Sequence, residues 1–155
     1  MDIHHELAGL VDALDKNGID YAVCGGIAVA LHGYSRFTKD IDLLVREEDV
    51  DAIKTIASKL GFLEDAGAIA FDKGAPNERV VHRISKIEAN NILTLDLIQS
   101  RPAFEDVWTD RELFQWQDGQ IQVVSANGLA KMKRLAGRDQ DLLDIKQLGL
   151  GDDQE

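Results

Sequence analysis

The stretch that decides the fold runs from Gly25 to Val45 and reads GGIAVALHGYSRFTKDIDLLV. It begins with a pair of glycines and a short apolar segment. After a polar turn it ends in a segment where aspartates alternate with aliphatic residues. Alternation with a period of two is typical of a β-strand, so residues 40–46 are expected to form one. Because Asp40 and Asp42 are two positions apart, their side chains leave the same face of this strand, about 6.6 Å apart along it.

Two aspartates in an apolar strand need an explanation, because aspartate is disfavoured in strands. The simplest explanation is a strand face that is open to solvent, and an isolated Asp-x-Asp also occurs often by chance. The alternative is a metal site. Mg²⁺ binds hard oxygen ligands and needs only one or two carboxylates besides the phosphates of a substrate. The second explanation predicts Mg²⁺ or Mn²⁺ at Asp40 and Asp42.

A third aspartate, Asp96, lies in residues 92–98, where every other residue except one threonine is apolar. Such a strand is normally buried on both faces, and an unpaired buried carboxylate is costly. One explanation is a buried ion pair, for instance with Arg36 or Arg83. The other is a metal site shared with the first two aspartates, in which Asp96 also acts as general base. The residues alone leave both explanations open.

The glycine pair, Gly25 and Gly26, lies between a predicted strand at 21–24 and a predicted short helix at 27–32. Glycine allows the backbone to approach a ligand closely, and the free N–H groups at the start of a helix attract anions. The simplest interpretation of the pair is a tight turn. Its short separation from Asp40 favours a phosphate-binding loop beside the carboxylates, so that both share one cleft.

Hydrophobic periodicity and turn residues predict the remaining elements. Helices are expected at 4–17, 47–60, 126–137 (capped by Ser125) and 140–148, a short helix and loop within 101–114, strands over 62–99 with turns at 67–68, 73–77 and 89–91, and a hairpin over 116–124. Together they predict an α+β (α/β) fold, in which helices flank one mixed sheet and further helices follow at the C-terminal end. A single domain is expected over 1–148, with a frayed tail at 149–155.

Composition limits the classes of protein that this chain can represent. Its 155 residues have a net charge of −11 and are 45% hydrophobic, which fits one globular domain and argues against broad electrostatic capture of nucleic acid. No signal-peptide pattern and no apolar run of roughly 20 residues is present, so no membrane association is expected. The single cysteine, Cys24, cannot form an internal disulfide. A reducing cytoplasm is therefore the expected location.

A basic segment near the C-terminal end stands out in this acidic chain. It contains Lys131, Lys133, Arg134 and Arg138 without an intervening acid. Three of these, all except Lys133, share one face of the predicted helix. The simplest interpretation is a solvated helix face. The alternative is a surface that meets a triphosphate or a nucleic-acid acceptor.

Taken together, these features resemble the nucleotidyltransferase fold of the polymerase-beta superfamily. The matching residues are Gly25-Gly26, the run Arg36-x-Thr38-x-Asp40-Ile41-Asp42-Leu43, and Asp96. Within this superfamily the chain resembles the bacterial minimal transferases, and more closely the abortive-infection type associated with toxin–antitoxin systems. The resemblance covers most of residues 21–148 and is most specific in the first block.

The resemblance implies a role for each matching residue. Gly25 and Gly26 would hold the triphosphate, Arg36 and Thr38 would line its approach, Asp40 and Asp42 would bind the metal ions, Asp96 would complete the metal site and act as base, and Lys131 would reach a phosphate or the acceptor. Many minimal transferases carry serine where Gly26 stands. A backbone contact would have to replace that hydroxyl here, as in the abortive-infection group.

The activity implied is transfer of a nucleoside monophosphate from a nucleoside triphosphate such as ATP onto a hydroxyl group. Pyrophosphate would be released, and Mg²⁺ or Mn²⁺ would be the cofactor. The acceptor, whether RNA, a protein or a small molecule, is left open. The alternative is a non-catalytic module with this fold, which binds a cognate partner protein in a toxin–antitoxin pair or acts as a nucleotide-binding regulator. The presence of all three aspartates favours the enzyme.

Overall fold

The computed structural model describes residues 1–34, 38–75, 78–136 and 146. Arg36, Arg138 and the tail predicted over 149–155 lie outside the described residues, and so does the helix predicted over 140–148 apart from Lys146.

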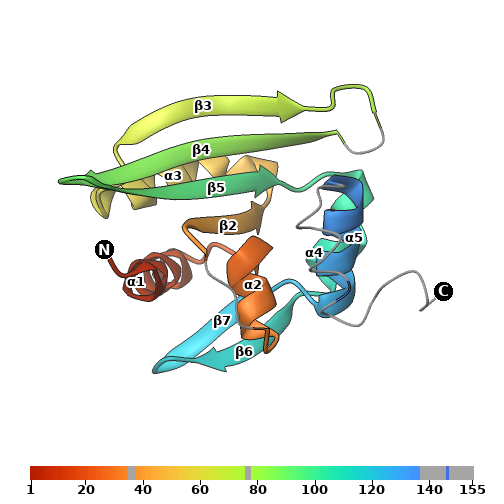
Figure 1. Ribbon diagram of the computed structural model, residues 1–155, viewed down its shortest axis with the longest axis horizontal. Coiled ribbons are helices and arrows are strands. Elements are labelled where there is room, and N and C mark those ends of the chain that lie inside the picture. Colours follow the sequence, from red (N-terminus) through yellow and green to blue (C-terminus); the bar gives the residue numbers. More distant parts are fainter. Residues whose placement is uncertain (35–37, 76–77, 137–145, 147–155) are drawn as a thin grey trace.

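One mixed β-sheet forms the centre of the molecule (Figure 1). Within the described residues its strands are β1 (Ala22–Cys24), β2 (Asp40–Val45), β3 (Glu64–Phe71), β4 (Arg79–Glu88), β5 (Asn91–Gln99), β6 (Glu112–Trp116) and β7 (Gly119–Val123). Their order in space is β3-β4-β5-β2-β1-β7-β6. The pairs β2/β5 and β1/β7 are parallel and the other neighbours are antiparallel. The predicted mixed sheet is confirmed.

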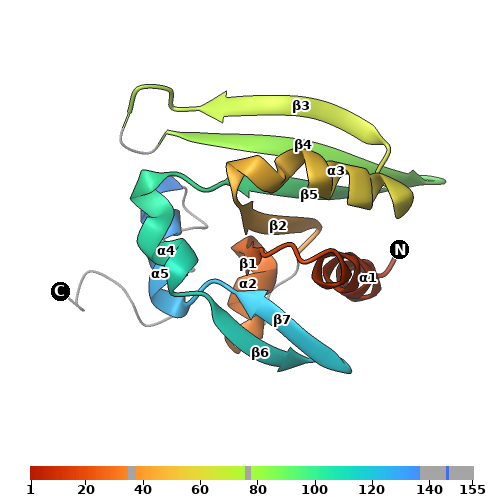
Figure 2. The same cartoon turned by 180° about the vertical axis from the view of Figure 1, so that it is seen from behind.

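Helices flank this sheet, as predicted. Those described are α1 (Ile3–Lys16), α2 (Gly25–Leu31), α3 (Val50–Lys59), α4 (Glu105–Thr109) and α5 (Ala126–Ala136), with 3₁₀ turns η1 (Glu47–Asp49) and η2 (Pro102–Phe104). Figure 1 and its reverse view, Figure 2, show α3 against the β3–β5 part of the sheet and α4 beside α5 at one end. No helix in the described ranges has the length and apolar character needed to cross a membrane.

Helix α1 shows how the sequence pattern produces these elements. Asp2 caps its start, since the Asp2 carboxylate accepts a hydrogen bond from the backbone N–H of His4 at 2.9 Å. Leu7, Leu10 and Leu14 follow helical spacing and are fully buried. Helix α5 is capped in the same way. The hydroxyl of Ser125, the predicted cap residue, accepts a hydrogen bond from the backbone N–H of Gly128 at 3.0 Å.

The turn predicted at 67–68 is wrong, because β3 continues through it. Gly67 has a φ of +80°, and the register with β4 shifts between Asp65 and Gly67. The Asp65 carboxylate accepts a hydrogen bond from the N–H of Gly67 at 2.7 Å. This glycine therefore forms a β-bulge inside the strand, which has the same local signature as a turn.

Two further boundaries differ from the sequence-based prediction. Helix α2 begins at Gly25 rather than at residue 27, so both glycines belong to its first turn and no loop separates it from β1. Strand β6 begins at Glu112, within the segment expected to be a short helix and loop. It lies at the edge of the sheet and pairs only with β7 among the described strands, so its conformation is decided by that pairing.

Candidate active site

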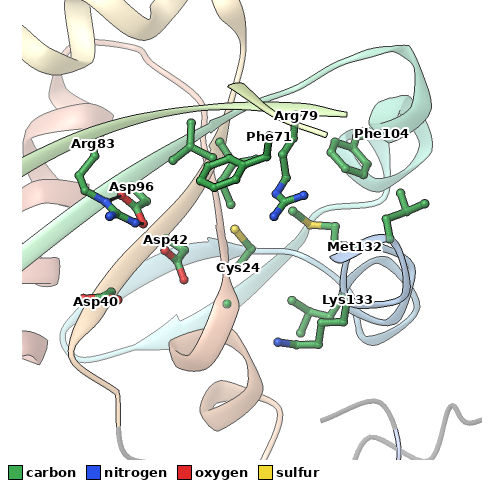
Figure 3. A pocket seen from close by; sticks show the side chains of 15 residues that line it. Cys24, Asp40, Asp42, Phe71, Arg79, Arg83, Asp96, Phe104, Met132 and Lys133 are labelled. Atoms are coloured by element: carbon green, nitrogen blue, oxygen red, sulfur yellow. Dashed lines mark hydrogen bonds and ion pairs between the residues drawn. The ribbon is translucent and has the colours of Figure 1, made fainter. Parts of the chain in front are cut away.

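A single row of residues crosses four neighbouring strands. Arg83 on β4 is in register with Asp96 on β5, Asp96 with Asp42 on β2, and Asp42 with Cys24 on β1. Residues directly opposite each other project from the same face of a sheet. All four line one cavity of about 400 Å³, shown in Figure 3. The row places a cation, two carboxylates and a thiol side by side.

Asp40 completes the acidic side of this cavity. It lies at the start of β2, on the same face as Asp42, and it lines the cavity as well. Figure 3 shows all three aspartates on one side of the cavity, with Arg83 beside Asp96. The fold therefore brings the three predicted carboxylates to one cavity, while their roles in catalysis and metal binding stay predictions.

The donor set can be compared with what a divalent metal requires. Within the described residues no group of three or more His, Cys, Asp or Glu side chains is arranged to hold a metal ion. Asp40 and Asp42 remain as two hard oxygen donors on one strand face. Two carboxylates combined with substrate phosphates fit the requirements of Mg²⁺, so these residues suit the predicted cofactor.

Asp96 is 8% exposed and forms a two-pronged ion pair with Arg83. The Nε of Arg83 donates to Oδ1 at 2.8 Å, and its Nη2 donates to Oδ2 at 3.0 Å. The hydrogen bond to Asp96, with further attraction from Asp96, Asp40 and Asp42, raises the pKa of Arg83 above its ordinary value. Of the two explanations for a buried Asp96, the ion pair is thus present, although it does not exclude a role in catalysis.

Gly25 is in direct contact with the acidic side. It has a φ of +66°, a region that favours glycine, and a Cβ at this position would overlap the carboxylate of Asp42. Gly25 lines the cavity, whereas Gly26 is buried in the first turn of α2 and is not among the lining residues described. The glycine pair and the carboxylates therefore meet through Gly25.

Two other predicted residues lie outside the cavity lining. The hydroxyl of Thr38 donates to the backbone carbonyl of Asp40 at 3.2 Å, at the start of β2. The Nζ of Lys131 contacts both carboxylate oxygens of Asp106 on α4, at 2.8 and 2.9 Å. The predicted contact of Lys131 with a phosphate or the acceptor stays a prediction.

Lys133 is the basic residue of α5 that lines the cavity, whereas the family resemblance gave the phosphate contact to Lys131. It is 6% exposed, unusually little for a lysine. Helical spacing could have identified it, because Lys133 is four positions after Leu129 and follows Met132, which also line the cavity. A lysine on the apolar face of an amphipathic helix was the signal.

The opposite end of the cavity is largely apolar and also carries Arg79 from β4. The guanidinium of Arg79 lies over the ring of Phe71, 4.7 Å from its centroid. Figure 3 shows Phe104 and Met132 at the far side from the aspartates. The cavity thus combines an acidic end with an aromatic and aliphatic end.

The family described as "uncharacterised nucleotidyltransferase" matches residues 1–130 of the chain. The chain belongs to this nucleotidyltransferase family. The matched residues include the three aspartates and Gly25, and they end before Lys133. The abortive-infection subtype stays a prediction. No curated protein matches the chain.

Solved structures share the nucleotidyltransferase fold. A protein of Thermotoga maritima described as a nucleotidyltransferase has a TM-score of 0.61 at 16% identity, covering 91% of this chain and 88% of its own. The lincomycin-bound lincosamide antibiotic adenylyltransferase LnuA has a TM-score of 0.57 at 18% identity, covering 94% and 95%. ANT(2″)-Ia in complex with adenylyl-2″-tobramycin has a TM-score of 0.54 at 13% identity, covering 96% and 89%. At these identities the likeness concerns the fold.

Cys24, next to the glycine pair of this nucleotidyltransferase, is not suited to nucleophilic catalysis. Burial is the main cause that raises the pKa of its thiol well above the ordinary value, and the charge of Asp42 adds to it. A buried, protonated thiol is a poor nucleophile. The carboxylates and cations of the cavity are therefore the candidates for its reactive groups.

Proposed function

We propose that this nucleotidyltransferase moves a nucleoside monophosphate from a nucleoside triphosphate, with ATP as the first candidate, onto a hydroxyl group of a small molecule. The observation that carries the proposal is the pairing of Asp42 with Asp96 on adjacent strands, beside Gly25 and in one cavity. The family match supports nucleotidyl transfer as the reaction class.

Asp40 and Asp42 would hold the divalent cation, Mg²⁺ or Mn²⁺. When bound, the cation would neutralise charge on the phosphates as the bond to pyrophosphate breaks. The absence of a side chain at Gly25 lets the Asp42 carboxylate lie against the start of α2. The backbone N–H groups of Gly25 and Gly26 would then face phosphate oxygens close to the cation.

Lys133 would supply a positive charge to the triphosphate from the opposite wall. It projects from α5 into the same cavity as Gly25 and Asp42. A positive charge that lines the cavity would attract the triphosphate and would stabilise the negative charge that develops on the leaving pyrophosphate. We assign to Lys133 the phosphate contact that the sequence suggested for Lys131.

A small-molecule acceptor is favoured by the size and lining of the cavity. Its volume of about 400 Å³ lies in the range of small-molecule sites, and its lining includes Phe71, Phe104 and Met132. The net charge of −11 disfavours a nucleic-acid acceptor. Two proteins that share the fold were solved with small molecules: LnuA with lincomycin and ANT(2″)-Ia with adenylyl-2″-tobramycin. The toxin–antitoxin association and a cognate partner protein stay predictions from the sequence resemblance.

The test is a transfer assay with each of the four labelled nucleoside triphosphates, with and without Mg²⁺ or Mn²⁺. The acceptors are a panel of hydroxylated small molecules and the small-molecule, RNA and protein fractions of a cell extract. We expect metal-dependent release of pyrophosphate and a product heavier by one nucleoside monophosphate in the small-molecule fraction. Label that enters RNA or protein instead would contradict the acceptor class. Triphosphate binding without pyrophosphate release would contradict the reaction.

A further inference from the structure

The ion pair between Arg83 and Asp96 is built into the candidate site rather than beside it. Both residues line the cavity, and they are direct partners on β4 and β5. On its other side Asp96 faces Asp42, its direct partner on β2. Like charges directly opposite each other destabilise a sheet, so the guanidinium offsets a repulsion that the site itself creates.

The two parallel hydrogen bonds from Arg83, here called its fork, restrict the orientation and the further partners of the Asp96 carboxylate. Each oxygen of Asp96 accepts one hydrogen bond from Arg83, at 2.8 and 3.0 Å. A carboxylate oxygen has two lone pairs, so one remains on each oxygen. The planar guanidinium also fixes the plane of the carboxylate, as a point charge would not. Asp96 is therefore held in one orientation, with limited capacity for a further partner.

A cation bound directly to Asp96 would lie close to this guanidinium. Two like charges at such a distance repel, which disfavours Asp96 as a metal ligand while Arg83 is in place. Asp40 and Asp42 do not carry this restriction to the same degree, since the register places Asp96, not either of them, opposite Arg83. The side chain of Arg83 is 44% exposed, so its removal changes the charge of the site with little loss of packing.

We propose that Arg83 is a positioning residue for nucleotidyl transfer, which orients the Asp96 carboxylate toward the acceptor hydroxyl and keeps it out of the coordination of the metal. The proposal rests on the proposed function. It leaves the cation to Asp40 and Asp42 and assigns to Asp96 an acceptor-facing role. It also explains why Asp96, one of three carboxylates that line the cavity, carries its own counter-ion.

The first test is Mn²⁺ binding to the nucleotide-free protein, followed by electron paramagnetic resonance. Arg83→Met frees Asp96 to bind the metal and removes a repelling charge, so we expect Mn²⁺ affinity to rise roughly tenfold. Asp96→Asn alone should bind Mn²⁺ more weakly than the wild type, because it leaves the charge of Arg83 in the cavity without its counter-ion. The double variant Arg83→Met/Asp96→Asn should return to the wild-type affinity, because the gain requires the freed carboxylate.

The second test is steady-state transfer. Arg83→Met should lower kcat by about 10- to 100-fold, with the KM for the triphosphate within about threefold of wild type. Arg83→Lys should recover part of kcat, since it keeps the charge but not the fork. If Arg83→Met does not fold, Arg83→Lys and the double variant, which removes both charges, still decide the question.

Lys86→Met is the matched control. Lys86 is on the same strand and donates to Glu6 at 2.8 Å, in an ion pair outside the cavity lining that is likewise shielded from solvent on its carboxylate side. It should lower stability without changing Mn²⁺ affinity or kcat. The proposal is overturned by unchanged or weaker Mn²⁺ binding in Arg83→Met, by a double variant that binds Mn²⁺ as tightly as Arg83→Met, or by wild-type protein that binds no Mn²⁺. Absence of transfer by the wild type would instead refute the proposed function, and the binding test would still decide the role of Arg83.

Discussion

The carboxylate of Asp42 lies against the backbone of Gly25, in the space that a Cβ at position 25 would occupy. This contact joins the glycine pair to the acidic side of the cavity. It also requires a residue without a side chain, since the φ of +66° and the overlap act together. The position of the Asp42 carboxylate and the identity of residue 25 are therefore coupled.

Gly25→Ala should cost about 1–2 kcal/mol of stability from the left-handed backbone, and it should also displace Asp42 and abolish transfer. Gly18→Ala is the matched control, because Gly18 has a φ of +68° and nothing lies within 4 Å of the place that its Cβ would take. The control should lose a similar amount of stability and keep its activity. Chemical denaturation and the transfer assay measure both. Equal activity in the two variants would contradict the coupling.

Asp42→Asn should abolish metal-dependent transfer and leave the fold intact. Asp42 and Asp96 are direct partners on adjacent strands, so removing one charge relieves repulsion in the metal-free protein. We expect a melting temperature equal to or above that of the wild type, together with weaker Mn²⁺ binding. Asp12→Asn, in an exposed pair with Lys16, is the control and should change neither property. Normal turnover in Asp42→Asn would rule out Asp42 as a metal ligand.

Lys133→Met should raise the KM for the triphosphate about tenfold or more, because it removes a positive charge of the cavity lining that would face the phosphates. Lys131→Met should have little effect, since Lys131 pairs with Asp106 outside the cavity lining. The two lysines are on the same helix, so each variant controls for the other. The reverse result would restore the sequence-based assignment of Lys131.

Tyr21 should make stability depend on alkaline pH. Burial is the main cause that raises the pKa of its phenol to about 12, from an ordinary value of 10.0. Between these values the unfolded chain loses the proton and the folded protein keeps it, so stability is full below pH 10 and falls as pH rises toward 12. The loss should be about 2–3 kcal/mol.

The measurement is denaturant unfolding of the wild type and Tyr21→Phe across this pH range. Tyr21→Phe lacks the phenol and should lose less stability than the wild type between the two ends. Tyr34→Phe is the control, because Tyr34 is exposed. A wild-type profile parallel to that of Tyr21→Phe would show that the phenol is not protected in the folded protein.

Local patterns were sufficient for most of the fold. Leu7, Leu10 and Leu14 repeat at helical spacing, and α1 follows from them. The alternation around Asp40 and Asp42 identified β2 to within one residue. One error came from a residue that fits two structures: Gly67 is as compatible with a β-bulge as with a turn, and only pairing with β4 decides between them.

The environment of the Lys133 side chain could not be predicted from the sequence. Its helix was predicted from the sequence, but whether a basic residue on it meets solvent or a cavity depends on what packs against each face. Lys131 and Lys133 are two positions apart and so point about 200° apart around the helix axis. One contacts Asp106 on α4, and the other lines the cavity.

The sequence by itself determined most of the elements, the three aspartates and the glycine pair, because helical and strand periodicity, caps and turns depend on neighbours along the chain. Only the tertiary structure decided that Asp96 is opposite Asp42 and is held by Arg83. Strand register joins residues far apart in sequence, and a shift of one position would turn every side chain of a strand to the other face. Local patterns therefore could not predict the pairing of β4, β5 and β2. This pairing brings Arg83, Asp96 and Asp42 into one cavity.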